Sequence, residues 1–306
     1  MRAKTVLSSI LAGPDGRLRL GWRLILFLTL TLSIAVPVIF LDGYLSGTPT
    51  EIGASVGFLL GSILAGWWLL TRDKRGFSAL GFYFSSDATK ESIRGLALGI
   101  GIGVVVITAI FLLGGVRWTP ESGTISGWLL GAFSALAFFT IPAAMEEAVV
   151  RGYAFQAVVE SWGVGAALTI TAIIFGALHY GNPDFGWVPL INITLAGVLL
   201  GVVYLKTLSL WWATGVHLGW NWTLGYLADV PVSGLELMDA PYYEGHPVGP
   251  EWLSGGGFGP EASLIAAVVL LLASILLWWG PWLCPGPSAA SSNALAHSRM
   301  KQRGNR

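Results

Sequence analysis

Three short polar motifs interrupt long apolar stretches of this sequence, and their residue types could perform acid–base or metal chemistry. An ionisable side chain at the centre of a bilayer costs at least ~2.5–3.5 kcal/mol to insert, so such residues are functional candidates by default. The three motifs are Glu146-Glu147-x-x-x-Arg151, Phe175-x-x-x-His179 and His217-x-x-x-Asn221.

The carboxylates and imidazoles of these motifs could act on a water molecule in either of two ways. In a cavity of low dielectric, Glu146 together with His179 and His217 has what general-base activation of water requires. An asparagine amide and a histidine ring can also donate hydrogen bonds to an oxyanion. The same Glu/His/His set could instead bind a divalent metal such as zinc, which would activate the water itself.

Helical spacing predicts which of these side chains share a face. Glu147 and Arg151 are four residues apart, so they can form an ion pair that lowers the cost of burying either residue. Glu146 is rotated by about 100° from Glu147 and can stay free of that pair. His217 and Asn221 are also four residues apart and therefore project from one face.

The composition identifies the class of protein that carries these motifs. Of 306 residues, 54% are hydrophobic and 11% are charged, and the mean hydropathy is +0.68. Soluble domains contain roughly 25% charged residues, so this chain cannot cover an ordinary water-facing surface. Lys and Arg number 17, as do Asp and Glu, which argues against nucleic-acid binding. The single cysteine, Cys284, excludes an internal disulfide framework. The sequence predicts a polytopic membrane protein.

Apolar segments long enough to cross a bilayer recur through the chain. About 20 apolar residues span the ~30 Å hydrocarbon layer as a helix. We therefore predict an all-α membrane protein, a bundle of about eight transmembrane helices. The expected spans are residues 22–41, 52–70, 93–116, 125–144, 164–180, 187–205, 209–227 and 262–283.

The distribution of basic residues predicts the orientation. Lys and Arg collect in the N-terminal arm, in the connections after the second and sixth spans, and in the C-terminal tail, whereas the alternate connections hold mostly acids. Cytoplasmic connections carry the excess of Lys and Arg, so both termini are expected in the cytoplasm. The expected location is an integral, multi-pass position in a prokaryotic plasma membrane.

The motifs can meet only if the fourth helix continues past its apolar run. If that helix ended at residue 144, Glu146 and His179 would lie at opposite surfaces of the bilayer. Residues 146–160 contain no expected helix breaker, however, and the first break falls at 161–163. A helix extended to Glu160 places Glu146 about 21 Å from that turn and His179 about 24 Å from it, at ~1.5 Å per residue. All three motifs can then converge in one layer inside the membrane.

The same reasoning divides the chain into six segments. The segment 229–261 is rich in Gly, Pro and acids and is expected to be an irregular cap or a flexible loop without chemistry. The segments are a basic cytoplasmic arm (1–21), three N-terminal helices with an interfacial piece at 76–86 (22–124), a catalytic core of four helices (125–228), an acidic outer loop (229–261), a last helix (262–283) and a basic tail (284–306).

Taken together, the motifs resemble those of the CPBP family of intramembrane metalloproteases, also called the type II CAAX prenyl endopeptidase, ABI or bacteriocin-processing family. The signature of that family is EExxxR, then FxxxH, then Hxxx followed by Asn or Asp. All three parts occur here in order, each on its own expected span. The resemblance covers about residues 125–230.

The resemblance implies a glutamate-dependent endopeptidase that acts inside the membrane on a peptide or protein substrate. It implies that Glu146 is the base and works with His179 on the attacking water. His217 and Asn221 would form the oxyanion site, and Glu147 and Arg151 would be the supporting ion pair. A divalent metal held by Glu146, His179 and His217 is the other possibility that the family allows.

Two other functions are compatible with the same residues. The chain could be a non-catalytic binding or immunity factor whose polar cluster only holds the fold together. It could also be a transporter that uses the buried acids and histidines, although no inverted repeat of broken helices is visible in the sequence. The expected partners are membrane lipid and a peptide or protein, with no nucleic acid.

Overall fold

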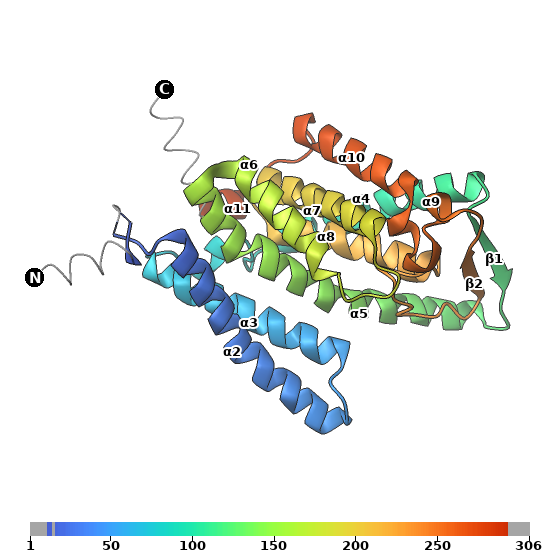
Figure 1. Cartoon of the computed structure of the whole chain (residues 1–306), viewed down its shortest axis with the longest axis horizontal. Coiled ribbons are helices and arrows are strands. Elements are labelled where there is room, and N and C mark those ends of the chain that lie inside the picture. Colours follow the sequence, from blue (N-terminus) through green and yellow to red (C-terminus); the bar gives the residue numbers. More distant parts are fainter. Residues whose placement is uncertain (1–10, 14–15, 293–306) are drawn as a thin grey trace, which may run out of the picture.

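A bundle of long helices forms the body of the protein in the computed structural model, which describes residues 11–13 and 16–292 (Figure 1). The α-helices are α2 (Leu20–Ser46), α3 (Glu51–Arg72), α4 (Ser86–Leu112), α5 (Ile125–Arg151), α6 (Tyr153–Leu178), α7 (Trp187–Thr207), α8 (Leu210–Trp222), α9 (Glu251–Ser254), α10 (Leu264–Trp279) and α11 (Pro287–Ser292). Helices α2 and α3 form a hairpin along one side of the bundle (Figure 1).

Short helical turns and two strands lie in the connections between these helices. The two strands pair antiparallel, with Val116 opposite Pro247 and Pro120 opposite Tyr243, and they lie at one end of the bundle (Figure 1). The short elements are the 3₁₀-helices η1 (Phe77–Leu80), η3 (Gly256–Phe258) and η4 (Pro260–Ala262), the π-helical turn η2 (Thr223–Leu227), and the strands β1 (Val116–Pro120) and β2 (Tyr243–Pro247).

Five of the described helical stretches are long and apolar enough to cross a membrane, the longest being 125–178 with α5 and α6 together. Each of the eight expected spans overlaps a helix, but α8 and α10 are shorter than a full crossing. The count of eight and the cytoplasmic position of both termini therefore stay predictions. The expected third span was too long, because α4 ends at Leu112 and Val116 already belongs to β1.

The continuation of the fourth helix has two breaks instead of the single one predicted. The turn at 161–163 is confirmed by Gly163, whose φ of 87° is a left-handed conformation that favours glycine. A second break, which no feature of the sequence indicated, lies at Gly152, between α5 and α6. Its amide donates to the carbonyl of Glu147 instead of Ala148, so this helical turn is one residue wider than usual. Residues 153–162 nevertheless stay helical, as the convergence of the motifs requires.

Helices α4 and α8 pack backbone against backbone through small residues. A Cβ atom added at Gly99 would lie 2.1 Å from the carbonyl oxygen of Val216 and 2.9 Å from the amide nitrogen of Trp220. A Cβ added at Gly95 would lie 2.5 Å from the carbonyl oxygen of Trp212. Small residues at such contacts let membrane helices approach closely, and here they set the position of the helix that carries His217.

We expect Gly99→Ala to destabilise the protein by about 1–3 kcal/mol, because the added methyl group overpacks a contact made by backbone atoms. Thermal unfolding in detergent measures this. Gly101→Ala is the matched control, since nothing lies within 4 Å of its added Cβ, and its stability should rise by up to ~1 kcal/mol through helix propensity. Equal effects of the two substitutions would contradict this packing.

The segment 229–261 is an ordered cap on the bundle and not a flexible loop, the other form expected for it. It contains β2, α9 and two 3₁₀-helices, and several of its apolar side chains are buried in the core with those of the long helices. Asp229 orders the start of the segment by accepting hydrogen bonds from the amides of Ala240 (3.0 Å) and Gly245 (3.2 Å). The Gly and Pro residues of this segment allow tight turns, and the segment is ordered.

Candidate functional site

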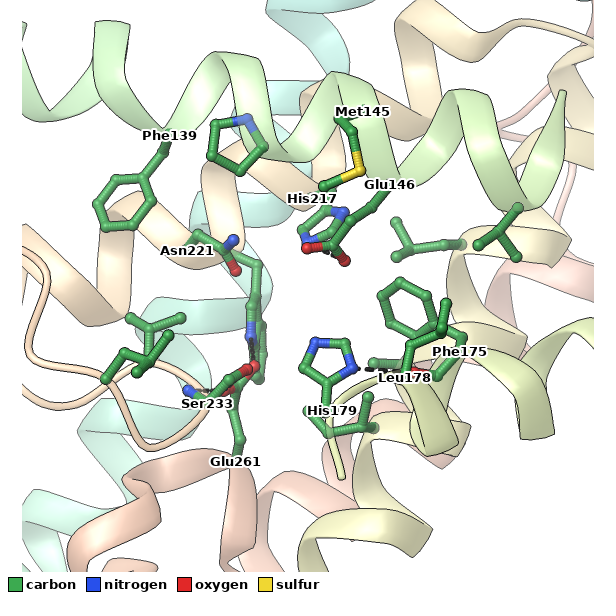
Figure 2. A pocket seen from close by; sticks show the side chains of 18 of the residues that line it. Phe139, Met145, Glu146, Phe175, Leu178, His179, His217, Asn221, Ser233 and Glu261 are labelled. Atoms are coloured by element: carbon green, nitrogen blue, oxygen red, sulfur yellow. Dashed lines mark hydrogen bonds and ion pairs between the residues drawn. The ribbon is translucent and has the colours of Figure 1, made fainter. Parts of the chain in front are cut away.

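A partly enclosed cavity of about 470 Å³ lies inside the helix bundle, and all three polar motifs reach it (Figure 2). Its walls come from helices α3 to α8, from α10 and from the segment 229–261. Apolar side chains make most of the surface. Glu146, His179, His217 and Asn221 all line this cavity, as the predicted convergence requires.

Glu147 and Arg151 form the predicted ion pair, and both side chains are fully buried. The guanidinium Nη1 of Arg151 donates to Oε1 of Glu147 at 2.9 Å, while its Nη2 donates to the carbonyl of Gly197 at 3.1 Å. The guanidinium also lies 4.2 Å from the centre of the Phe175 ring, which favours a cation over its face. Paired in this way, the two charges can remain buried behind the cavity wall.

His217 lies between the two carboxylates of the first motif. Its Nδ1–H donates to Oε1 of Glu147 at 3.0 Å, and its Nε2 lies 3.8 Å from Oε2 of Glu146. A histidine whose one nitrogen is held by a carboxylate has its ring orientation and tautomer fixed. Sequence spacing gave no sign of this link, because residues 147 and 217 meet only through the packing of α5 against α8.

Glu146 points into the cavity (Figure 2). Its side chain is 25% exposed, in contrast with the complete burial of Glu147. One carboxylate oxygen of each acid, Oε2, has no hydrogen-bond partner in the protein, but only Glu146 points that carboxylate into the cavity. The 100° rotation between adjacent helical positions therefore separates two roles, a sealed structural acid and an acid that faces the cavity.

His179 faces Glu146 and His217 from the other side of the cavity (Figure 2). It caps the end of α6, and its Nδ1–H donates to the carbonyl of Phe175 at 2.9 Å. This bond leaves Nε2 unprotonated in the neutral ring, so that His179 can accept a proton there. The Phe175 ring contacts both histidines, at 5.2 Å from His179 and 5.9 Å from His217 between ring centres.

Asn221 lies one helical turn beyond His217, and its side chain points into the same cavity (Figure 2). The shared face predicted for this pair is therefore confirmed. An amide in this place can donate hydrogen bonds to a substrate atom.

The segment 229–261 contributes cavity residues that no sequence motif indicated. Glu261 is 4% exposed and lines the cavity. Its carboxylate accepts hydrogen bonds from Trp220 Nε1 (2.8 Å), Ser233 N (2.5 Å) and Ser233 Oγ (2.8 Å). Asn182, in the connection between α6 and α7, also lines the cavity and donates to the carbonyl of Ser233 at 2.8 Å. These bonds hold the segment over the cavity as one of its walls.

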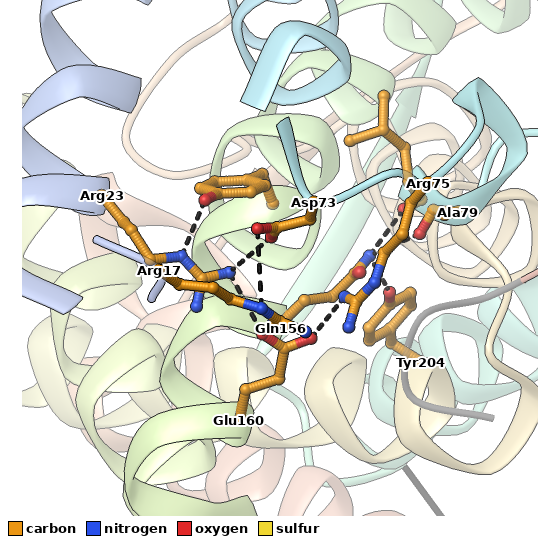
Figure 3. A network of polar contacts seen from close by, with 10 residues as sticks. Arg17, Arg23, Asp73, Arg75, Ala79, Gln156, Glu160 and Tyr204 are labelled. Atoms are coloured by element: carbon orange, nitrogen blue, oxygen red, sulfur yellow. Dashed lines mark hydrogen bonds and ion pairs between the residues drawn. The ribbon is translucent and has the colours of Figure 1, made fainter. Parts of the chain in front are cut away.

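A cluster of charged side chains anchors the helical segment that follows Gly152 (Figure 3). Glu160 pairs with Arg23 at 3.1 Å and with Arg17 at 3.3 Å, and it also contacts Arg75. Three cations around one carboxylate fix the far end of this segment to the start of α2 and to the connection after α3.

Gln156 ties the expected interfacial piece 76–86 to the same segment. Its side-chain amide donates to the carbonyls of Ala79 (3.0 Å) and Leu80 (3.1 Å) and is buried. The piece 76–86 is therefore held against the core of the bundle, next to the break that ends α5.

The three side chains considered as metal ligands share a cavity without forming a metal-binding group. In the part of the chain that the structure describes, no group of three or more His, Cys, Asp or Glu side chains is placed to hold a metal ion. Glu146, His179 and His217 nevertheless line one cavity, so they offer a water one acid and two imidazoles, and metal binding by these three residues stays a prediction.

The apolar helices, with a cavity inside them that is lined by acids and histidines, define a multi-pass membrane protein with a buried acid–histidine site. Residues 127–223, from α5 to the start of η2, match the family described as type II CAAX prenyl endopeptidase Rce1-like. The match confirms the family predicted from the motifs. It is a family of proteases, which supports peptidase activity and a peptide or protein substrate. No curated protein and no solved structure matches the chain.

Proposed function

We propose that this protein is an intramembrane endopeptidase that hydrolyses a peptide bond with a water activated by Glu146. The observation that carries the proposal is the contrast between the two adjacent acids. Glu147 is fully buried and paired with Arg151 at 2.9 Å, whereas Glu146 faces the cavity, is 25% exposed and lies 3.8 Å from His217. An acid that is left free in a shielded cavity beside two imidazoles is suited to take a proton from water.

The proposed reaction begins with transfer of a proton from water to the Glu146 carboxylate. The water oxygen attacks the carbonyl carbon of the substrate, and the carbonyl oxygen becomes an oxyanion. Nε2 of His179 accepts a hydrogen bond from the same water and so orients it. When the tetrahedral intermediate collapses, the C–N bond breaks and the proton passes from Glu146 to the leaving nitrogen. The products are a carboxylic acid and an amine, and transfer of the acid proton to the amine gives a carboxylate and an ammonium group.

Asn221 and His217 are proposed to stabilise the oxyanion. Asn221 can donate from its amide into the cavity, and a protonated His217 can donate from Nε2 while Nδ1–H stays bonded to Glu147. Donors that are already in place when the charge develops contribute more than mobile water would. Arg151 and Glu147 act through His217, whose ring they hold in position.

The non-catalytic alternative finds less support in the contacts of Glu146. Glu147 is held by Arg151 and by His217, as expected of a residue that holds the fold together, whereas Glu146 points into the cavity and is 25% exposed. The transporter alternative predicts flux across liposomes that depends on the acids and histidines. Metal binding by Glu146, His179 and His217 is a separate prediction, which elemental analysis of the purified protein tests.

Comparative peptidomics of membranes tests the proposed function. Cells that express the wild type are compared with cells that express Glu146→Gln at the same level. We expect at least one membrane-associated protein or peptide to accumulate uncut in the variant, together with loss of its fragments. Identical peptide profiles in the two membranes would contradict the proposal, provided that the variant is folded.

A further inference from the structure

A second hollow lies between the two helices of the α2–α3 hairpin, apart from the cavity that the three motifs reach (Figure 1). It is an open groove of about 490 Å³. Leu30 and Ile34 of α2 form one wall, and side chains of α3 between Leu64 and Thr71 form the other. All of these lining side chains except Thr71 are apolar or aromatic, so the groove suits a hydrocarbon chain.

The groove opens on the exposed side of the hairpin, near the end of α3. Leu64 and Trp68, which line it, are 42% and 41% exposed, so lipid tails can reach both side chains. Leu64 precedes the last residue of α3, Arg72, by eight positions, which places this wall within ~12 Å of the helix end at ~1.5 Å per residue. The basic connection that follows α3 is predicted to face the cytoplasm.

Aromatic side chains place this end of the groove at the level of the lipid headgroups. Trp67 and Trp68 both line the groove, and tryptophan collects at the boundary between lipid and water. The ring of Trp67 meets that of Phe77 edge-on at 6.2 Å, and Phe77 stacks on Phe84 at 5.9 Å. A lipid whose tail lay in the groove would therefore have its polar end beside the last turn of α3.

Cations without an acidic partner lie at that end. The guanidinium of Arg72 is 4.5 Å from the centre of the Trp68 ring, on the groove wall. Its neighbours Asp73 and Arg75 belong to the charged cluster of Figure 3. Arg72 and Lys74 are exposed, and within the described part of the chain neither forms an ion pair. Two positive charges are thus available to a ligand.

We propose that this groove is a binding site for one anionic phospholipid, with an acyl chain between α2 and α3 and the phosphate on Arg72. An arginine guanidinium can bind a phosphate through two parallel hydrogen bonds, and its contact with Trp68 holds its plane in place. Lys74 adds a second charge that attracts an anionic headgroup. The site is separate from the proposed catalytic cavity and does not depend on the proposed activity.

A zwitterionic lipid distinguishes the two parts of the proposed site. Phosphatidylcholine offers the groove the same hydrocarbon as phosphatidylglycerol with identical acyl chains, but its headgroup carries a cation that Arg72 and Lys74 repel. The acyl chain therefore supplies affinity for both lipids, and the two basic side chains supply the preference for the anionic one.

Native mass spectrometry of the full-length protein, released from detergent micelles with either lipid added, tests the proposal. We expect one phosphatidylglycerol to bind the wild type at least ~5-fold more tightly than phosphatidylcholine, since one basic residue near an anionic lipid contributes about 1 kcal/mol. Arg72→Gln should weaken phosphatidylglycerol binding by about the same factor and leave phosphatidylcholine binding unchanged. Arg94→Gln is the matched control, because Arg94 is an exposed arginine of α4 that does not line the groove.

A second pair of variants tests the groove itself. Leu64→Trp places a larger side chain on the groove wall and should weaken binding of both lipids by several-fold. Leu60→Trp is its control, because Leu60 is 45% exposed one helical turn away and does not line the groove. Equal binding of the two lipids by the wild type would overturn the proposal. Equal losses in Arg72→Gln and Arg94→Gln, or in Leu64→Trp and Leu60→Trp, would overturn it as well.

Discussion

Replacing Glu146 by Gln is expected to lower the kcat for peptide hydrolysis by about 10³-fold, because the amide cannot take the proton from water. The fold should be unaffected. Glu146 faces the cavity, and its Oε2 atom makes no hydrogen bond to the protein, so the substitution removes a charge without breaking a buried hydrogen bond. Hydrolysis of a quenched fluorescent peptide, made from a cut site that the comparative peptidomics identifies, measures the rate. The melting temperature in the same detergent should be equal to that of the wild type or higher.

The matched control is Glu147→Gln, the same chemical change one residue along α5. This substitution leaves the Arg151 guanidinium buried without its carboxylate and weakens the support of His217. We therefore expect it to lower both the stability and the activity. A Glu146→Gln protein that keeps full activity would eliminate Glu146 as the base, whatever the control shows.

Replacing Arg151 by Met is expected to destabilise the protein by about 3–5 kcal/mol, the usual effect of removing one partner from a buried ion pair. The Glu147 carboxylate would remain fully buried with only His217 as a partner. The bond to the Gly197 carbonyl and the contact with the Phe175 ring would also be lost. Chemical or thermal unfolding in detergent measures the change.

The double variant Glu147→Gln with Arg151→Met tests how much of the lost stability comes from an unpaired buried charge and how much from lost packing. It removes both charges, so its stability should recover by at least half of the loss seen in Arg151→Met. Its activity should stay low, because the ring of His217 would lose its carboxylate partner. Full recovery of activity in the double variant would show that the pair does not position His217.

The helices and their polar faces could be predicted from local sequence alone. Long apolar runs indicate membrane helices whatever their neighbours are, and a spacing of four residues places Glu147 with Arg151 and His217 with Asn221. The continuation of the fourth helix past residue 144 could also be predicted, because Glu146 and His179 would otherwise lie at opposite surfaces of the bilayer. The break at Gly152 could not be predicted, because a glycine inside a helical pattern is often tolerated and its conformation depends on tertiary contacts.

Contacts between distant segments could be decided only by the tertiary structure. Whether His217 meets Glu147 or Glu146 depends on how α8 rotates against α5, and that rotation is set by close backbone packing at Gly99. In the sequence, Glu261 is one of several acids in a polar segment, and nothing distinguishes it from the others. In the structure, hydrogen bonds from Trp220 and Ser233 place it in the cavity wall. Periodicity indicates which side chains share a face, whereas packing alone decides what that face meets.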